Sequence, residues 1–397
     1  MRIAFVAGAF PKLSETFVLE QILKLLALGH DVRIYAFDAP AETVRHAAIA
    51  NHGLLDRTLY FTRRPRGGLL SALSTVMKDK ELGFSALRER EALAQRQQHG
   101  PQGDFDVIYC HFGHIAERAR KLRSVGFFGG PLVAVFHALD VTVLVEGAHT
   151  YARLFQDAAR LLPISHHWQK RLIELGAPAS KVEVRHMGVD CSALAYRPRS
   201  LTPDRPVSIV SVGRLVEKKG FAYAIRALAR AEKSLGRQLD YHLVGDGPLR
   251  EELEQLARAE GVAERVTFHG ARRSDEVVGL LARANILMAP SVTASNGDME
   301  GIPMVLMEAM AQGLPVISTA HSGIPELVRH GESGVLVPER DADALAAAVT
   351  DLVRTPERWP SLLSHARRTV EAEFDSNQLA KDLEQVFARL GRGARAG

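Results

Sequence analysis

The stretch "RIAFVAGAFPKLSETFVLEQILKLLALGHDVRIYAF", residues 2–37, places a helical segment between two short apolar runs. The runs at 3–6 and 32–37 are rich in β-branched and aromatic residues, as buried strands are. Between them apolar residues recur at helical spacing, and Gly29 is suited to end the helix. A strand, a helix and a second strand in this order form a βαβ unit. The sequence therefore predicts an α/β fold with a parallel, doubly wound sheet.

The same alternation continues along the whole chain, with one interruption at 195–206. This segment, "AYRPRSLTPDRP", has three prolines and no periodicity, so we interpret it as a linker. The segments 1–195 and 205–373 are each expected to form a Rossmann-like domain, and two such domains facing each other predict a central cleft. The expected strands lie at 3–6, 32–37, 107–110, 132–136, 161–165, 182–184, 207–212, 241–244, 266–269, 286–289, 316–319 and 335–337.

The composition is that of a soluble globular protein, with 46% apolar and 24% charged residues. No uncharged apolar run reaches the roughly 18 residues that a membrane span needs. The first ten residues are interpreted as a strand and not as a signal peptide. The only cysteines, Cys110 and Cys191, lack the spacing of a metal site, which favours a reducing cytoplasm and no disulfide framework.

Positive charge is concentrated in the first half of the chain. The segment 57–98 holds nine basic and four acidic residues, including "RRPR" at 63–66. One interpretation is a solvated helical face. The alternative is a surface that approaches anionic lipid headgroups or a diphosphate-bearing acceptor. Nucleic acid is disfavoured as a partner, because aromatic residues are few and no binding motif is present.

Two strand-to-helix loops of the second half carry the residue types of an anion site. In "SVGRLVEKKG", 211–220, Gly213 allows a tight turn, while Arg214 and Lys219 can both point at one anion. An arginine fork together with a lysine point charge suits a diphosphate. The next loop, "LVGDGP" at 243–248, has glycines that would let the backbone approach a planar or phosphate group.

A further stretch, "GDMEGIPMVLMEAMAQG" at 297–313, contains a carboxylate within an apolar helix. The helix is expected at 303–312, with Pro303 as its first residue and Gly313 as its cap. Glu308 then lies inside this helix, where a buried charge is costly unless something meets it. Either Glu308 pairs with a neighbour for structural reasons, or it faces a site that a polar ligand fills.

Glu300 lies in the loop that precedes the same helix. Free amide groups near Gly301 and Ile302 at the helix start can form an anion site. A phosphate bound there would leave Glu300 beside the group that the phosphate carries and Glu308 towards a nucleoside. The two glutamates could thus hold a nucleotide sugar at its two ends, with 318–328 as a further wall of the site.

Several motifs follow one another along the chain. They are "GRLVEKKG", "LVGDGP", "VTFHG" and "PSVTASNGDMEGIPMVLMEAMAQGLPVISTAHSGIPELV" in the second half and "FPKLSETFVLEQI", "YCHFGH", "FHALDV" and "VRHMGVD" in the first. The motifs of the second half resemble, in order, those of the family 4 retaining glycosyltransferases of GT-B fold, and the Glu-x7-Glu pair is the hallmark of that family. The first half resembles the bacterial exopolysaccharide branch, with colanic-acid-type transferases as examples.

The resemblance implies a role for each matching residue. Arg214 and Lys219 would hold the donor diphosphate, and Glu308 would bind the ribose. Glu300 would hold the transferred sugar, and His137 would reach the reacting face of the sugar. The other residues assigned to the donor are Gly213, Asp246, Gly270, Gly301, Ile302 and Pro303, with the base expected near Asp246 and Gly270. The residues expected on the acceptor side are His111, His114 and Ser14.

His111, His114 and His137 could also be imagined as a metal cluster. We favour a role for His111 and His114 in the acceptor pocket, because no Asp-x-Asp follows a strand to bridge a metal to a diphosphate. No metal and no cofactor is therefore expected. Retention by double displacement would need a carboxylate nucleophile close to the anomeric carbon. None is evident, so we expect a front-face route in which the leaving phosphate takes the acceptor proton.

The segment 374–390 has one apolar helical face. The family resemblance implies that this helix packs back on the N-terminal domain. The alternative is that it packs on its own domain. The function expected from all these features is transfer of a sugar from a UDP- or GDP-type donor to a growing, lipid-linked saccharide at the inner membrane face. Three alternatives stay open: a nucleotide-sugar epimerase, a transferase with a soluble small-molecule acceptor, and a binding or scaffold protein.

Overall fold

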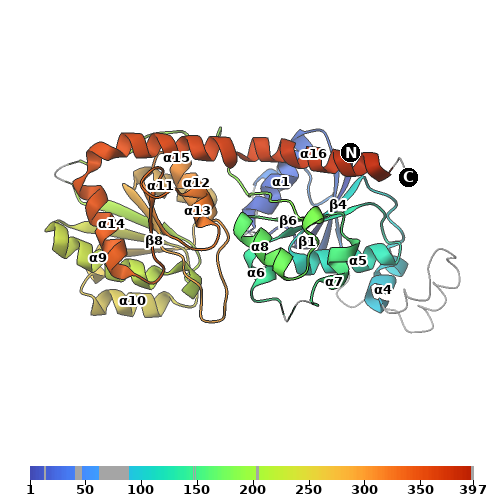
Figure 1. Ribbon diagram of the computed structural model, residues 1–397, viewed down its shortest axis with the longest axis horizontal. Coiled ribbons are helices and arrows are strands. Elements are labelled where there is room, and N and C mark those ends of the chain that lie inside the picture. The colour runs from blue at the N-terminus through green and yellow to red at the C-terminus, as the bar shows by residue number, and fades with distance from the viewer. Residues whose placement is uncertain are drawn as a thin grey trace. The chain divides into compact units, whose positions relative to one another are not determined.

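The computed structural model describes residues 1–12, 15–40, 47–61, 89–145, 147, 149–202 and 205–394 (Figure 1). The chain divides into two units. Unit 1 comprises Met1–Ile164, Trp168–Arg185 and the chain from Asn377 onward. Unit 2 comprises Ser165–His167 and His186–Ser376.

Unit 1 is built on a parallel sheet, as the βαβ pattern predicts. Its strands follow the order β3-β2-β1-β4-β5-β6, and every described neighbour pair is parallel. This is the order of a doubly wound sheet, in which the order of the strands along the sheet reverses between β1 and β4. The strands are β1 (Arg2–Ala9), β2 (Asp31–Asp38), β3 (Thr58–Tyr60), β4 (Val107–His111), β5 (Leu132–Phe136) and β6 (Arg160–Pro163).

The central strands of unit 1 are buried throughout, because helices cover the sheet on both faces. Every residue of β4 and β5 is buried, and these strands show no polar alternation. The helices of this unit are α1 (Thr16–Ala27), α2 (Ala47–Asn51), α4 (Arg90–His99), α5 (Gly113–Ser124), α6 (Ala138–Val141), α7 (Ala152–Asp157), α8 (His166–Glu174), which begins in unit 2, and most of α16 (Ser376–Ala394).

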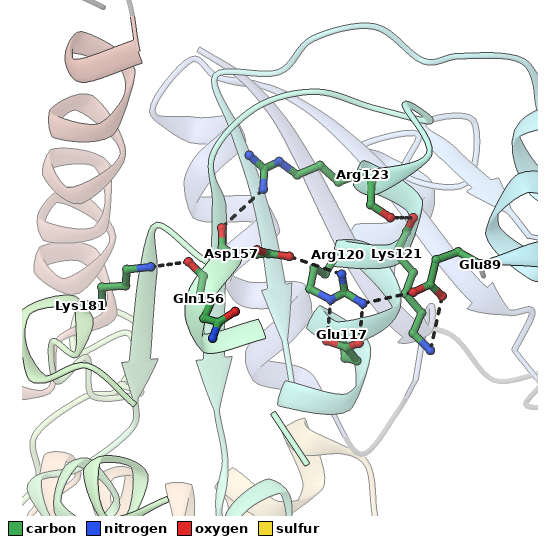
Figure 2. A network of polar contacts seen from close by, with 9 residues as sticks. Glu89, Glu117, Arg120, Lys121, Arg123, Gln156, Asp157 and Lys181 are labelled. Carbon is green, nitrogen blue, oxygen red and sulfur yellow. Dashed lines mark hydrogen bonds and ion pairs between the residues drawn. The ribbon is translucent and has the colours of Figure 1, made fainter. Parts of the chain in front are cut away.

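A polar network around Arg120 joins three segments of unit 1 (Figure 2). The guanidinium of Arg120 contacts Glu117 within α5, Asp157 at the end of α7 and Glu89 at the start of α4, with shortest N–O distances of 2.8, 3.3 and 3.4 Å. These carboxylates, with Glu117 first, raise the pKa of Arg120 despite its burial. Replacing Arg120 would leave three carboxylates close together without their cation, so we interpret this network as one that stabilises the fold.

Unit 2 repeats the topology of unit 1. Its sheet has the order β12-β11-β10-β7-β8-β9, again with parallel neighbours. Numbered from its own first strand, it has the same 3-2-1-4-5-6 order, with the reversal between β7 and β10. The strands are β7 (Val207–Val212), β8 (Leu239–Val244), β9 (Val266–Gly270), β10 (Ile286–Ala289), β11 (Val316–Thr319) and β12 (Val335–Val337).

Two helix layers cover the sheet of unit 2. Helices α9 and α14 pack on the face that includes Ile286 and Met288, while α12 and the C-terminal half of α15 pack on the face that includes Leu287. Successive residues of β10 thus point to opposite layers, as the period of a strand requires. The α-helices are α9 (Phe221–Leu235), α10 (Arg250–Ala259), α11 (Ser274–Arg283), α12 (Met304–Ala311), α13 (Ile324–Leu327), α14 (Ala342–Arg354) and α15 (Trp359–Glu373).

In the first half, one strand was missed and one strand prediction was wrong. The short strand β3 was not expected at all. The strand expected at 182–184 is absent, because Val182 pairs with Leu161 only as an isolated bridge. Glu183 and Arg185 donate backbone hydrogen bonds to β6, but Pro163 has no N–H group to donate in return. The ladder therefore does not extend into a strand.

Helix α16 contributes to unit 1 although it follows unit 2 in the chain. Phe387 packs edge-on against Tyr109 of β4, with ring centroids 5.2 Å apart. At the other end, Lys24 Nζ of α1 donates to Asn377 Oδ1 at 2.7 Å. Leu383 and Val386 are buried on the same helix, so this face completes the core of unit 1.

Candidate functional site

The candidate donor site lies where the carboxyl ends of β7 and β10 meet, at the point where the strand order of unit 2 reverses. Ligands of doubly wound sheets bind at this point. The loop after β7 contains the short 3-10 helix η3 (Glu217–Lys219) and ends at Gly220. The loop after β10 runs from 290 to the start of α12. The first loop brings basic side chains and the second brings acidic ones.

Glu300 lies against two lysines of η3. Its Oε1 is 3.2 Å from Lys219 Nζ and 3.6 Å from Lys218 Nζ, and its side chain is 12% exposed. Burial alone would raise the pKa of Glu300, but the charges of Lys219 and Lys218 outweigh it and hold the pKa below its usual value. Glu300 is therefore an ionised carboxylate whose orientation is set by two cations.

Further contacts tie the loop after β10 to the loop after β7. Lys218 Nζ lies 3.1 Å from Asp298 Oδ1 and donates to the carbonyl of Met299 at 3.3 Å. Glu217 Oε2 accepts from both the backbone N–H and the hydroxyl of Ser295. Contacts within the protein thus hold the loop after β10 in place along most of its length.

Gly213 makes room for the side chain of Lys219. A Cβ at Gly213 would come within 2.9 Å of Lys219 Cε. A Cβ at Gly245 would lie 1.9 Å from the carbonyl oxygen of Gly213, and one at Gly247 would lie 2.6 Å from the carbonyl oxygen of Leu215. That these glycines let the backbone approach a planar or phosphate group stays a prediction; the close approach that the structure shows is to the protein's own backbone.

Arg214 is exposed, and its guanidinium makes no hydrogen bond or ion pair with any described residue. Nearby, Asp246 is exposed, its Oδ1 accepts from Gly247 N–H, and its carbonyl accepts from Leu215 N–H. Gly270 ends β9 in a left-handed conformation and accepts from Gly245 N–H. The structure therefore brings the ends of β7, β8 and β9 together through their backbones.

The helix that carries Glu308 differs slightly from the prediction. Pro303 has an extended ψ of 126° and precedes α12, and its carbonyl accepts the first hydrogen bond, from Leu306. Pro303 is therefore the N-cap residue, not the first helical residue. The helix ends at Ala311, and Gln312 separates it from Gly313, which has a φ of +74°.

Glu308 lies on the less buried face of α12. Only Met304 and Glu308 in this helix are half-buried, and the other six residues belong to the core. Their spacing of four residues places both side chains on one face. The carboxylate thus lies outside the apolar core, beside a loop whose Ile302 is buried. Gly301, between Glu300 and Ile302, is half-buried.

Two residues of this site were not predicted. His321, two residues after β11, is fully buried, and its Nε2 lies 3.0 Å from the backbone nitrogen of Glu300. Its Nδ1 lies 2.7 Å from Oε1 of Glu339, which follows β12. Both residues lie at the carboxyl ends of strands, so the rule that located Arg214 could have located them as well.

In unit 1 the predicted His137 and His111 are direct partners. His111 ends β4 and His137 follows β5, and their Nδ1 and Nε2 atoms are 3.0 Å apart. Burial lowers the pKa of His111, and it lowers the pKa of His137 to about 4 although Asp140 opposes this. The two imidazoles are therefore neutral at physiological pH. His111 Nε2 also contacts Gln21, and the side chain of His111 is buried. His111 therefore contacts His137 from within the core and does not line a surface.

Asp140 joins the predicted histidines of unit 1. It is fully buried, and its Oδ1 lies 3.1 Å from Nδ1 of His114 while its Oδ2 accepts from His137 N–H. His114 itself is 45% exposed. Asp140 belongs to the quoted "FHALDV" motif, but its role could not be inferred without the helical turn that follows β5. Ser14 lies outside the described residues.

The described ranges contain neither a cluster of metal ligands nor a helix that could span a membrane. No group of three or more His, Cys, Asp or Glu side chains there could hold a metal ion. In the same ranges no helix has both the length and the apolar composition that crossing a bilayer requires. The basic segment 57–98 is described only at its ends, because residues 62–88 lie outside the described ranges.

Two Rossmann-like sheets of identical strand order define the GT-B class of glycosyltransferase folds. Solved structures share this fold over nearly the whole chain. Anabaena HepE in complex with UDP has a TM-score of 0.74 at 21% identity and covers 98% of this chain and 100% of its own. Sucrose-phosphate synthase of Thermosynechococcus elongatus has a TM-score of 0.72 at 20% identity and covers 99% and 100%.

The sequence comparisons then identify the family. The model of Glycosyltransferase Family 4 matches residues 14–193, and that of Glycosyl transferases group 1 matches 194–369. A putative colanic acid biosynthesis glycosyltransferase, WcaL of Salmonella typhimurium, is 36% identical over 98% of this chain and 100% of its own length. The amylovoran biosynthesis glycosyltransferase AmsK of Erwinia amylovora gives the same three values. The chain belongs to the family 4 glycosyltransferases of GT-B fold.

Proposed function

We propose that this glycosyltransferase transfers a sugar from a nucleotide-sugar donor to a growing, lipid-linked saccharide in exopolysaccharide biosynthesis, with retention at the anomeric carbon. The observation that carries the donor site is the ionised Glu300 beside Lys219, at the strand-order reversal where the exposed Arg214 also lies. The two full-length relatives, named for colanic acid and amylovoran biosynthesis, support the exopolysaccharide pathway.

In this proposal Arg214 and Lys219 bind the donor diphosphate, with Arg214 as a fork and Lys219 as a point charge. Glu308 accepts hydrogen bonds from the ribose hydroxyls, and Glu300 accepts them from the transferred sugar. Gly213 keeps the space that the Lys219 side chain occupies. The base lies near Asp246 and Gly270, where the ends of β8 and β9 meet.

The reaction we propose follows the front face of the sugar. The bond between the anomeric carbon and the phosphate oxygen breaks, and the acceptor hydroxyl oxygen bonds to the same face of that carbon. The acceptor proton passes to the departing phosphate oxygen. Lys219 and Arg214 stabilise the charge that develops on the phosphate, so no metal is needed. Glu300 is not proposed as the nucleophile, because its carboxylate, which lies against Lys219 and Lys218, is assigned to the hydroxyls of the transferred sugar. The part of His137 in the reaction stays a prediction of the family resemblance.

The test is equilibrium binding of UDP-, GDP-, ADP- and dTDP-sugars to the wild type and to Glu308→Ala, followed by product analysis. One nucleotide sugar should bind selectively, and binding should weaken in the variant. Transfer should leave the anomeric configuration unchanged in the product's NMR spectrum. Inversion would overturn the mechanism. An isomerised sugar that stays attached to its nucleotide would instead identify an epimerase, and binding without turnover would identify a binding protein.

We also propose that the enzyme is cytoplasmic and contacts the inner face of the plasma membrane through its basic segment at 57–98. The excess of basic residues there supports the proposal. Reversing the charge of Arg63, Arg64 and Arg66 should abolish sedimentation with vesicles that contain anionic phospholipid. Unchanged sedimentation would remove the membrane contact from the proposal, and full transfer to a soluble saccharide would favour a soluble acceptor.

A further inference from the structure

The hydrogen bonds of His321 define its protonation state. Its Nε2 lies 3.0 Å from the backbone nitrogen of Glu300, and this N–H group can only donate. Nε2 must therefore be the unprotonated nitrogen, and Nδ1 carries the hydrogen that points to Glu339 Oε1 at 2.7 Å. The imidazole is neutral in this arrangement and works as a bridge between a carboxylate and a backbone amide.

Glu339 anchors the bridge at its other end. Its second oxygen, Oε2, accepts from the backbone N–H of Thr293 at 2.7 Å. Burial would raise the pKa of Glu339, but the hydrogen bonds from Thr293 and His321 lower it below its usual value. Glu339 is thus a carboxylate with both oxygens engaged, each by a defined donor.

His321 and Glu339 together hold both ends of the loop after β10. Thr293 is the fourth residue of this loop, and Glu300 lies close to the end of the loop. The next residue after Glu339, Arg340, donates to the carbonyl of Thr293, and its guanidinium lies 3.4 Å from Glu217. The loop is therefore fixed from the β11 and β12 side through its backbone.

The side chain of Glu300 is fixed from the opposite side. Lys219 and Lys218 come from the loop after β7 and contact the carboxylate, whereas His321 contacts only the backbone nitrogen. Position and orientation of this glutamate are thus set by separate residues. A change at His321 should move the carboxylate without removing its charge or its cations.

We propose that His321 and Glu339 are positioning residues for the reaction: they hold the Glu300 backbone where its carboxylate meets the transferred sugar. This inference rests on the proposed role of Glu300. It differs from a purely structural role in one respect, because it predicts a defect in turnover and not in donor binding. Arg214 and Lys219, which are proposed to bind the diphosphate, do not contact His321.

Two substitutions separate the halves of the bridge. In His321→Gln the side-chain oxygen can take the place of Nε2 and accept from Glu300 N–H. In His321→Asn the side-chain nitrogen can take the place of Nδ1 and donate to Glu339, but nothing accepts from Glu300. A matched control is His330→Asn, because Nδ1 of the exposed His330 accepts from the backbone N–H of Leu336 elsewhere in unit 2.

The measurements are kcat for transfer, Kd for the donor and the thermal unfolding midpoint of each variant. We expect kcat of His321→Asn to fall about 10- to 100-fold, the scale of a misplaced reacting group, with donor Kd within about threefold of wild type. His321→Gln should recover most of this loss, and His330→Asn should match wild type. If His321→Asn does not fold, Glu339→Gln, which keeps one acceptor oxygen for two donors, should show the same loss of kcat.

Several results would overturn the inference. One is equal kcat in His321→Asn, His321→Gln and wild type. Another is a loss that appears in donor Kd while kcat is kept, which would make the bridge part of donor binding. Wild-type kcat in Glu339→Gln would also contradict it. A wild type that neither binds nor turns over any nucleotide sugar would instead refute the proposed function, so the two failures are distinguishable.

Discussion

Lys219 Nζ lies 3.2 Å from Glu300 Oε1, and Gly213 provides the space through which the Lys219 side chain reaches that position. The cation that we propose to bind the donor diphosphate is therefore also one of the two cations that lower the pKa of Glu300, the carboxylate that we propose to bind the sugar. A substitution of Lys219 or Glu300 should therefore alter the position and the electrostatic environment of the other residue.

Glu300→Gln should lower kcat by about 100-fold or more, because the neutral amide loses the interaction that strengthens as charge develops on the sugar. Donor Kd should stay the same or decrease, since Lys219 is then free to meet the diphosphate. Initial rates with the donor identified by the binding screen would measure this. Glu332→Gln, at an exposed glutamate in the same unit, is the matched control. Wild-type turnover in Glu300→Gln would exclude a role for the carboxylate in the reaction.

Arg214→Ala should weaken donor binding about 10- to 100-fold, the loss expected for one or two hydrogen bonds to a charged group. The stability of the protein should change by less than about 0.5 kcal/mol, because Arg214 is exposed and contacts no described partner. Calorimetric titration with the donor and thermal unfolding would test both. A large loss of stability with unchanged donor Kd would reverse the interpretation of this residue.

Gly245→Ala should destabilise unit 2 by roughly 2–4 kcal/mol, because the new Cβ would lie 1.9 Å from the carbonyl oxygen of Gly213, and the backbone would have to shift to relieve this clash. Gly261→Ala is a suitable comparison: Gly261 also has a positive φ, but nothing lies within 4 Å of its Cβ position. That change should cost only about 1–2 kcal/mol. Urea unfolding followed by Trp359 fluorescence reports on unit 2 if Trp168 is replaced by Phe. Equal costs would show that the turns at 213 and 245 can separate.

The stability of unit 1 should fall as the pH decreases from 7 to 5. The folded pKa of His137 is about 4, below the ordinary value of about 6.5, so the unfolded chain binds more protons in this range. Stability from this group is complete above pH 6.5 and is lost as the pH falls towards 4. For His137 alone the loss between pH 7 and 5 is about 2 kcal/mol.

Urea unfolding of a Trp359→Phe protein, in which Trp168 reports on unit 1, would measure this loss. His137→Gln should show a smaller change with pH than the otherwise identical parent. A pH dependence that is the same in both proteins would mean that other groups cause it.

Excess chelator should leave the transfer rate unchanged, because in the proposed mechanism Arg214 and Lys219 neutralise the diphosphate. The rate should be measured before and after exhaustive treatment with chelator, with a magnesium-dependent transferase treated in parallel. Loss of activity that returns with a divalent cation would show that the basic residues are not sufficient.

The sheet of each unit could be predicted well because its central strands are buried on both faces. The runs at 207–212 and 316–319, which are rich in β-branched residues, have the observed bounds of β7 and β11. The failures lie at the edges of the first sheet. Strand β3 has only half-buried residues, and the pairing of Val182 depends on which residue of β6 lacks an N–H group. Such features depend on neighbours that the local sequence does not specify.

The site was partly predictable for the same reason. Arg214 and Lys219 lie in the loop after one recognisable strand and Glu300 in the loop after another, so their common location follows from topology. The bond between His321 and Glu339 connects two loops whose conformations no local pattern specifies. The same holds for Gly245. Its sequence pattern suggested that a ligand approaches the backbone there, whereas the structure shows that the carbonyl of Gly213 lies beside it.

Helix α16 has a consequence for the order in which the protein is made. The buried residues that it supplies to unit 1, among them Phe387 against Tyr109, are translated after all of unit 2. While the ribosome synthesises residues 186–376, the first sheet has already emerged but lacks this part of its apolar covering. Domains generally fold in the order in which they leave the ribosome. In this chain unit 2 can complete its core first, and the part that began translation first is the last to finish.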